Sequence, residues 1–106
     1  MSVTLVYVTA SSKAEAMEIG KKLVEAKLAA CVNIIERMHS IYWWKGKMEE
    51  SEEVVLIAKT TAEAVEGLME AVRESHSYSV PCMLTIPVTG GSKEYLDWLH
   101  RNVKNC

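Results

Sequence analysis

Several classes of protein are excluded by what this sequence lacks. It has no apolar run near the about 20 residues that a membrane-spanning helix needs, and its opening stretch lacks the basic leader of a signal peptide. Positive charge is not in excess either, because the formal net charge is -2. We therefore expect a cytoplasmic protein that binds neither nucleic acid nor membranes.

Cysteine is scarce, and the chain has no Cys-x-x-Cys pair. The three cysteines, Cys31, Cys82 and Cys106, are an odd number without the spacing of a disulfide framework. We expect reduced thiols and no zinc ribbon. A phosphate-binding loop, a recognisable nucleophile with its base and paired acids at a known spacing are also absent from the sequence. We therefore do not expect an enzyme.

The most informative stretch is a pair of strand-like runs in the middle of the chain. Residues 31–44 and 47–59 flank Lys45-Gly46, a pair suited to a two-residue hairpin turn with positive φ. Arms of about 13 residues at about 3.3 Å per residue make a ribbon roughly 43 Å long, whereas a domain of this size has a radius of gyration of about 13 Å. One end of the hairpin must therefore project beyond the core.

The projecting end of this hairpin carries Tyr42, Trp43 and Trp44. An uncovered aromatic tip is typical of an association surface, so we expect an oligomer whose subunits exchange strand edges or hairpin tips. The same turn places His39 opposite Glu52 across the ladder. That pair is either a cross-strand contact or an ion-binding pair.

Short strand and helix signals precede the hairpin. Residues 3–8 form an apolar, β-branched run typical of a central strand. Residues 12–15 read Ser-Lys-Ala-Glu, a capping box that opens a helix reaching about Ala26. Gly20 in that helix predicts a close approach to the sheet. The residues that recur at helical spacing are Ala16, Ile19, Gly20 and Leu23.

Similar signals follow the hairpin. Residues 60–63 repeat the capping pattern before a second helix, and Ser92 is the expected cap of a last helix. Between them, residues 82–88 are strand-like, and Pro87 places that strand at an edge or ends it. The apolar face of the second helix consists of Val65, Leu68, Met69 and Val72. That of the last helix consists of Tyr95, Trp98, Leu99 and Val103.

The element order predicts the fold class. A β-α-β-β-α-β order followed by a further helix is the ferredoxin-like arrangement, an α+β sandwich with helices on one face of an antiparallel sheet. We expect residues 1–106 to form one such domain with a long β-hairpin. Nothing in the chain is left to cover the second sheet face, which therefore favours packing against other subunits.

Three stretches resemble the CutA divalent-cation tolerance family. Residues 28–34 read LAACVNI, residues 40–47 read SIYWWKGK before Glu49, Glu50 and Glu53, and Tyr95, Leu96 and Trp98 resemble a terminal YLxW. The resemblance covers nearly the whole chain. It implies a homotrimer of ferredoxin-like subunits built through the long hairpins, in a family associated with divalent metal tolerance and copper binding.

The loop after the second helix departs from that family pattern. His76 and Tyr78 are kept, but Ser77, Ser79 and Cys82 stand where the family usually has a proline and two glutamates. The loss of two carboxylates disfavours an oxygen-rich cation site, whereas a thiolate at Cys82 suits a softer ion such as Cu(I) or Zn²⁺.

The candidate metal ligands are Cys31, His76 and Cys82, for copper or another divalent cation and with no organic cofactor. Each has a structural alternative. Cys31 is read in preference as a buried thiol acting as a small hydrophobe. His76 either ligates a metal or bonds the last carbonyls of a helix, where a histidine also suits the negative end of the dipole.

A second candidate site combines aromatic faces with both signs of charge, as in a small-ligand cleft between subunits. Its alternative is interface packing with a polar rim. Two functions therefore stay open: a trimeric metal-binding protein, and a trimeric signalling protein that binds a small anionic metabolite, beside a purely structural assembly role. The cleft residues are Tyr42, Trp44, Lys45, Glu49, Lys59 and Tyr78.

Overall fold

The computed structural model describes residues 2–104 of the chain. Cys106, one of the expected free thiols, lies outside the described residues. The helices and strands follow the predicted order, with a 3-10 turn (η1) added before the second helix. They are β1 (Val3–Ala10), α1 (Lys13–Glu25), β2 (Cys31–Trp44), β3 (Lys47–Thr61), η1 (Ala62–Ala64), α2 (Val65–Ser75), β4 (Met83–Pro87) and α3 (Lys93–Arg101).

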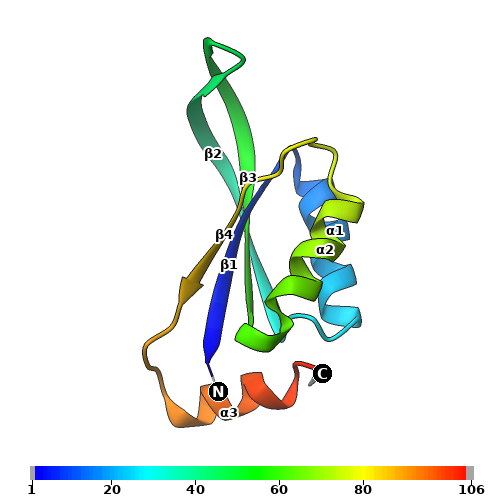
Figure 1. The fold of residues 1–106 in the computed structure, drawn as a ribbon, viewed down its shortest axis with the longest axis vertical. Helices are drawn as coiled ribbons and strands as arrows, with labels where there is room; N and C mark the ends of the chain where they lie inside the picture. Colours follow the sequence, from blue (N-terminus) through cyan, green and yellow to red (C-terminus); the bar gives the residue numbers. More distant parts are fainter. Residues whose placement is uncertain (1, 105–106) are drawn as a thin grey trace.

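The strands form one antiparallel sheet in the order β2-β3-β1-β4. This order makes β1 central and puts β4 at an edge, as Pro87 predicted. Figure 1 shows α1 and α2 on one face of the sheet and α3 across its foot, near the N-terminus. The arrangement confirms the ferredoxin-like α+β class with an extra C-terminal helix.

The long hairpin is confirmed. Lys45 and Gly46 have φ angles of 51° and 77°, both in the left-handed region that a tight two-residue turn needs. The two arms extend past the rest of the fold at the top of Figure 1, along the 44 Å axis of the molecule. His39 pairs with Glu52, as the turn position predicted, and its Nδ1 lies 4.0 Å from Oε2 of the glutamate.

A β-bulge in β2 decides which hairpin side chains face which side of the sheet. Ile35 pairs with Val55 but Met38 pairs with Glu53, and Arg37 within the bulge has a φ of 65°. The extra residue reverses the alternation of side chains along the strand. Odd-numbered residues of β2 face away from the helices before the bulge, and even-numbered residues do so after it.

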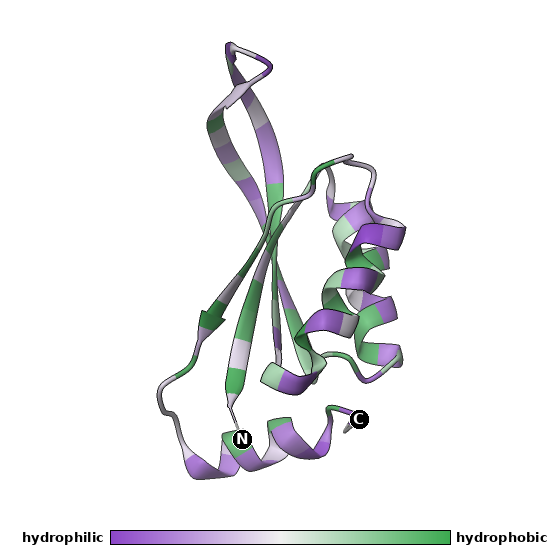
Figure 2. Ribbon diagram, in the orientation of Figure 1, coloured by the Kyte–Doolittle hydropathy of each residue, from purple (hydrophilic) through white to green (hydrophobic). Residues whose placement is uncertain are grey.

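The covered face of the sheet holds the main core, as predicted. The predicted apolar face of α1 is buried against residues of the sheet such as Val6 and Leu56. Gly20 confirms the expected close approach, because a Cβ there would lie 2.8 Å from Cγ2 of Val32. In Figure 2, hydrophobic residues follow β1 through the middle of the sheet, whereas the upper arm of β3 is largely hydrophilic.

The helix caps are only partly as predicted. Ser12 and Ser92 accept hydrogen bonds from the amides three residues on, at 3.1 Å and 3.4 Å, and cap α1 and α3. The capping pattern at residues 60–63 is wrong, because β3 continues through Thr61 and this side chain makes no cap bond. Thr60 instead donates to the carbonyl of Leu28 at 2.6 Å, which ties the strand to the chain entering β2.

The opposite face of the sheet, here called the open face, carries Leu5, Tyr7, Ile57, Leu84 and Ile86, and no helix formed by residues 2–104 packs on it (Figure 1). Leu84 and Ile86 are 59% and 46% exposed. At the foot of the molecule α3 buries Leu99 and Val103, but Tyr95 and Trp98 from its predicted apolar face stay exposed. The open face is therefore the main unfilled apolar surface of the sheet.

Candidate functional site: a pocket on the open face

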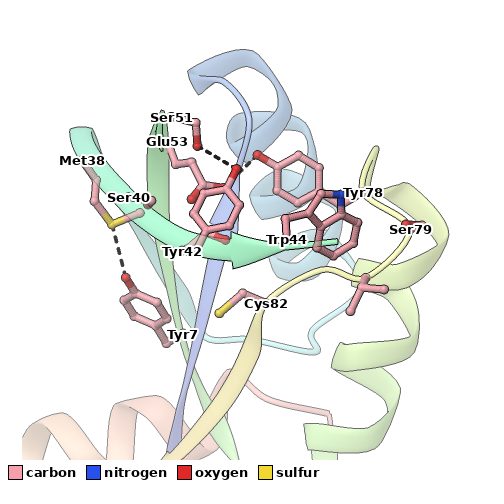
Figure 3. Close-up of a pocket in the computed structure, with 12 residues that line it drawn as sticks. Tyr7, Met38, Ser40, Tyr42, Trp44, Ser51, Glu53, Tyr78, Ser79 and Cys82 are labelled. Carbon is pink, nitrogen blue, oxygen red and sulfur yellow. Dashed lines mark hydrogen bonds between the residues drawn. The ribbon is translucent and has the colours of Figure 1, made fainter. Parts of the chain in front are cut away.

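A pocket of about 580 Å³ lies on the open face, between the projecting part of the hairpin and the loop that follows α2 (Figure 3). We call it the Glu53 pocket. The bulge creates it, because it turns the even-numbered residues of β2 onto the open face beside β1. Its lining residues are Tyr7, Thr9, Met38, Ser40, Tyr42, Trp44, Ser51, Glu53, Tyr78, Ser79, Val80 and Cys82.

The carboxylate of Glu53 is the charged group of this pocket. Glu53 is only 9% exposed, and its Oε2 accepts a hydrogen bond of 2.8 Å from the hydroxyl of Tyr78. Burial raises the pKa of the Tyr78 phenol, and the bond to Glu53 raises it further, so the phenol keeps its proton and remains a donor. The pair places an acid and an aromatic ring side by side.

Further aromatic side chains line the pocket from the sheet. The hydroxyls of Tyr42 and Ser51 lie 3.3 Å apart, and the Tyr7 hydroxyl donates to Sδ of Met38 at 3.3 Å. Figure 3 shows the rings of Tyr42, Trp44 and Tyr78 gathered on one side of the pocket. The three tyrosine hydroxyls are therefore engaged within the chain, and the ring faces remain available to a ligand.

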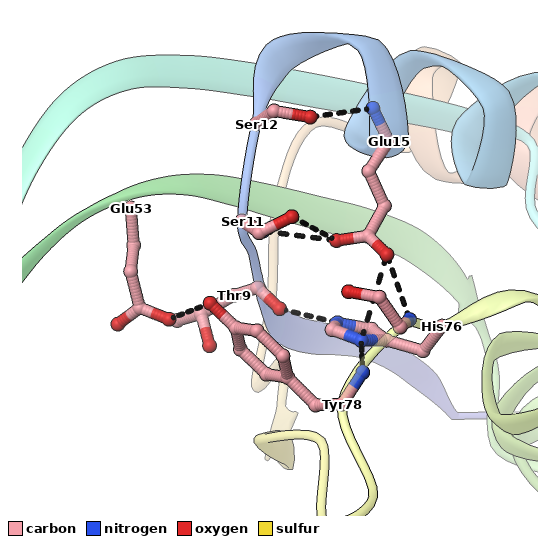
Figure 4. A network of polar contacts seen from close by, with 8 residues as sticks. Thr9, Ser11, Ser12, Glu15, Glu53, His76 and Tyr78 are labelled. Carbon is pink, nitrogen blue, oxygen red and sulfur yellow. Dashed lines mark hydrogen bonds and ion pairs between the residues drawn. The ribbon is translucent and has the colours of Figure 1, made fainter.

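His76 holds the loop that supplies Tyr78. Its side chain is 0% exposed, and both ring nitrogens are engaged: Nε2 donates to the carbonyl of Thr9 at 2.7 Å, and Nδ1 accepts from the amide of Tyr78 at 3.0 Å (Figure 4). Both roles are fixed, because an amide only donates and a carbonyl only accepts. His76 thus positions Tyr78 and leaves neither nitrogen free for a metal.

Glu15 fastens the same loop to the start of α1 (Figure 4). One carboxylate oxygen accepts from the amide and hydroxyl of Ser11, both at 2.9 Å, and the other accepts from the amide of Ser77 at 2.7 Å and lies 3.9 Å from Nδ1 of His76. Partial burial alone would raise the pKa of Glu15, but the hydrogen bonds from Ser11 and Ser77 outweigh it and lower the pKa to about 2.

The candidate metal ligands lie in different parts of the fold. Cys82 lines the Glu53 pocket just before β4, whereas Cys31 begins β2 at the opposite edge of the sheet. With strand spacings of about 4.8 Å, the edge strands are separated by roughly 14 Å. Within residues 2–104, no group of three or more histidine, cysteine, aspartate or glutamate side chains is placed to hold a metal ion. One chain alone therefore does not fit a complete metal site.

The candidate cleft residues are only partly brought together. Tyr42, Trp44 and Tyr78 line the Glu53 pocket. Lys45 is at the hairpin turn, 5.9 Å from the Trp44 ring centre, and Glu49 pairs with Tyr42 without lining the pocket.

Lys59 lies at the other end of the open face. Its Nζ donates to the Tyr95 hydroxyl at 3.2 Å, and this bond raises the pKa of Lys59. Cys31 pairs with Lys59 in the ladder, and its Sγ accepts from the same hydroxyl at 3.9 Å.

Sequence reasoning missed Glu53 as the acid of the pocket. Four glutamates lie between residues 49 and 53, and alternation along β3 turns both Glu49 and Glu53 to the open side. The bulge in β2 then places Met38 opposite Glu53, and of these two glutamates Glu53 lines the pocket.

Comparison with known proteins decides the family. A family model described as the CutA1 divalent ion tolerance protein matches residues 4–102, which include every element of the fold but the first residue of β1. The chain belongs to the CutA family. The resemblance in residues 28–34, 40–47 and 95–98 is thereby confirmed, and with it the assignment to a family named for divalent-cation tolerance and not for a reaction.

Relatives within the CutA family differ in length. The divalent-cation tolerance protein CutA of Archaeoglobus fulgidus is 44% identical over 99 residues, which cover 93% of this chain and 96% of that protein. The chloroplastic CutA of Arabidopsis thaliana is 41% identical over 101 residues, but these span only 56% of that protein.

A solved CutA structure from Archaeoglobus fulgidus, described as a periplasmic divalent cation tolerance protein, has 43% sequence identity and a TM-score of 0.93, covering 96% of this chain and 99% of that one. The expected cytoplasmic location thus differs from that of a near relative. None of the helices formed by residues 2–104 is long and apolar enough to cross a lipid bilayer.

Proposed function

We propose that this CutA protein acts in divalent-cation tolerance as a cytoplasmic homotrimer, and that it binds the cation, copper foremost, between its subunits. We take it to bind neither nucleic acid nor membranes and to catalyse no reaction. The observation that carries the proposal is the pair of unlike sheet edges, β2 and β4, each with a partly exposed cysteine beside it.

Unlike edges favour a closed ring. The edge of β4 is short and the edge of β2 is long, so pairing β4 of one copy with β2 of the next is a head-to-tail contact. Repeated contacts of this kind close into a ring if the rotation between neighbouring copies fits. Such pairing satisfies main-chain groups that an edge strand leaves open.

The same contact would place on neighbouring strands two cysteines that one chain keeps at opposite edges of its sheet. Cys31 begins β2 and Cys82 precedes β4, and the register of the edge pairing decides how closely the two thiols approach. Thiolates prefer soft ions, and copper is the tightest binder among divalent first-row metals. His76 enters this site only if its bonds to Thr9 and Tyr78 are broken.

The test is an anaerobic titration of the reduced protein with Cu(I) under a competing chelator, beside Zn²⁺ and Cu²⁺. The expected result is tight binding at a whole number of sites per trimer, lost in Cys31→Ser and in Cys82→Ser and kept in His76→Ala. Cys106→Ser is the matched thiol control. Weak binding without fixed stoichiometry, indifferent to the first two substitutions, would remove the metal site as proposed.

A second candidate function is small-molecule sensing, favoured by the volume and aromatic lining of the Glu53 pocket. For an anionic metabolite in a cleft between subunits, binding is expected to depend on Lys45 or Lys59. Neither lysine lines the pocket of the single chain, so this candidate function rests on a contribution from a neighbouring subunit.

A further inference from the structure

The Glu53 pocket contains a negative charge that lacks a cationic partner. Glu53 is nine-tenths buried, yet within residues 2–104 no lysine, arginine or histidine nitrogen lies within 4.0 Å of its carboxylate. Tyr78 donates to Oε2, and no hydrogen bond within the same residues reaches Oε1. A buried carboxylate is costly unless it is paired, so this oxygen favours a positively charged group placed in the pocket.

The walls beside this carboxylate are aromatic. Tyr42, Trp44 and Tyr78 line the pocket together with Tyr7, and no lysine, arginine or histidine is among its lining residues in the described part of the chain. Ring faces attract cations within about 6 Å, most strongly those that shed water easily. Figure 3 shows the rings of Tyr42, Trp44 and Tyr78 on the same side as the Glu53 side chain, so both kinds of group can contact one ligand.

We propose that the Glu53 pocket binds a small organic cation, an alkylammonium or quaternary ammonium group. The carboxylate neutralises the charge through Oε1, while the aromatic rings surround the alkyl substituents. A volume of about 580 Å³ suits a small metabolite and is far larger than a metal ion needs. Mg²⁺ and Ca²⁺ also require about six oxygen ligands, carboxylates foremost, whereas this pocket supplies a single carboxylate.

This inference goes beyond metal tolerance and is independent of the thiols. The proposed edge pairing uses main-chain groups in the plane of the sheet, whereas the carboxylate and the rings of the pocket lie on its face, so the two proposals rest on different groups. Cation binding at Glu53 and copper binding by Cys31 and Cys82 therefore predict different mutational results.

The experiment compares choline with its uncharged isostere 3,3-dimethylbutan-1-ol on the full chain, by isothermal titration calorimetry and by tryptophan fluorescence. Choline should bind and change the fluorescence emission of Trp44. The isostere has the same shape but no charge, and it should bind at least about tenfold more weakly. Glu53→Gln keeps an acceptor for Tyr78 but removes the charge, and should weaken choline binding by at least about tenfold. Trp44→Leu, at the partly exposed end of the pocket, should also weaken it.

Glu52→Gln is the matched control, because Glu52 precedes Glu53 in the sequence but faces the other side of the hairpin beside His39. It should leave choline binding unchanged, and so should Cys31→Ser. Equal binding of choline and its isostere, or full affinity in Glu53→Gln, would overturn the proposal. A metal ion that binds Glu53 and displaces choline would also overturn it. The same holds for choline binding that disappears as sedimentation shows self-association, because a second copy of the chain would then fill the pocket.

Discussion

The two ends of the open face use the same device with opposite charge. Near the hairpin, the Tyr78 hydroxyl donates to the carboxylate of Glu53; near α3, the Tyr95 hydroxyl accepts from the ammonium of Lys59. The first pair is partly buried, with Glu53 9% exposed, and lines a pocket, whereas in the second pair Tyr95 is 41% exposed. One sheet face thus carries an acidic site and a basic site on the same strand, β3, roughly 20 Å apart at about 3.3 Å per residue.

The contrast shows that burial, more than residue type, separates a binding site from surface chemistry. Lys59 beside Tyr95 and Cys31 has many of the ingredients of a reactive site, but water screens its charge. Glu53 has fewer partners and far less water, so its charge acts at full strength on whatever enters the pocket. The following substitutions test this difference.

The largest effect is expected from His76→Ala. The substitution empties a fully buried position and leaves the Thr9 carbonyl and the Tyr78 amide without their partner, so we expect a loss of about 2–4 kcal/mol in unfolding free energy. Urea unfolding followed by circular dichroism measures it. Choline binding should fall as well, because Tyr78 is no longer held over the pocket.

His39→Ala is the control for that variant. His39 is an exposed histidine whose ring is 4.0 Å from Glu52, so its removal should change stability by less than about 0.5 kcal/mol. If the two histidine variants were equally stable, the structural role of His76 would be wrong, and its metal-ligand role would regain support.

The fold was largely predictable from sequence, and the site was not, for identifiable reasons. Hydrophobic spacing and the Lys45-Gly46 turn act locally, so they gave the strands, the helices and the pairing of His39 with Glu52. The Glu53 pocket depends on the bulge at Arg37, which adds one residue to β2 without any composition signal and reverses the side-chain alternation.

The capping pattern at residues 60–63 failed for a related reason. Thr60 and Thr61 can cap a helix or extend a strand, and pairing of β3 with β1 along its whole length selects the strand. His76 was ambiguous for the same cause, since its partners Thr9 and Tyr78 are known only once β1 and the loop after α2 have met.

A smaller effect is expected when each tyrosine loses its hydroxyl. Tyr78→Phe leaves Glu53 buried without its donor and should lower the unfolding free energy by about 1–3 kcal/mol. Tyr95→Phe removes an exposed contact of Lys59 and should cost less than about 0.5 kcal/mol. Parallel urea titrations compare the two; equal losses would show that burial does not distinguish the ends of the open face.

The smallest effect concerns the carboxylate that anchors the pocket loop. The pKa of Glu15 is about 2 in the folded protein against 4.5 for the free side chain, so its contribution is complete above pH 4.5 and is lost as the pH falls towards 2. Because the group is partly exposed, we expect on the order of 1–2 kcal/mol after screening. Glu15→Gln should therefore unfold more easily than the unmodified protein at pH 7, with the difference shrinking below pH 4.5.

Glu18→Gln, on the exposed side of the same helix, is the control for Glu15→Gln and should show no such convergence. Urea titrations at pH 7, 4.5 and 3 measure both variants beside the unmodified protein. A gap between Glu15→Gln and the unmodified protein that stays constant across this range would mean that Ser11 and Ser77 hold the loop without needing the charge. The loop that supplies Tyr78 would then be held by neutral hydrogen bonds, among them those of His76 to Thr9 and Tyr78.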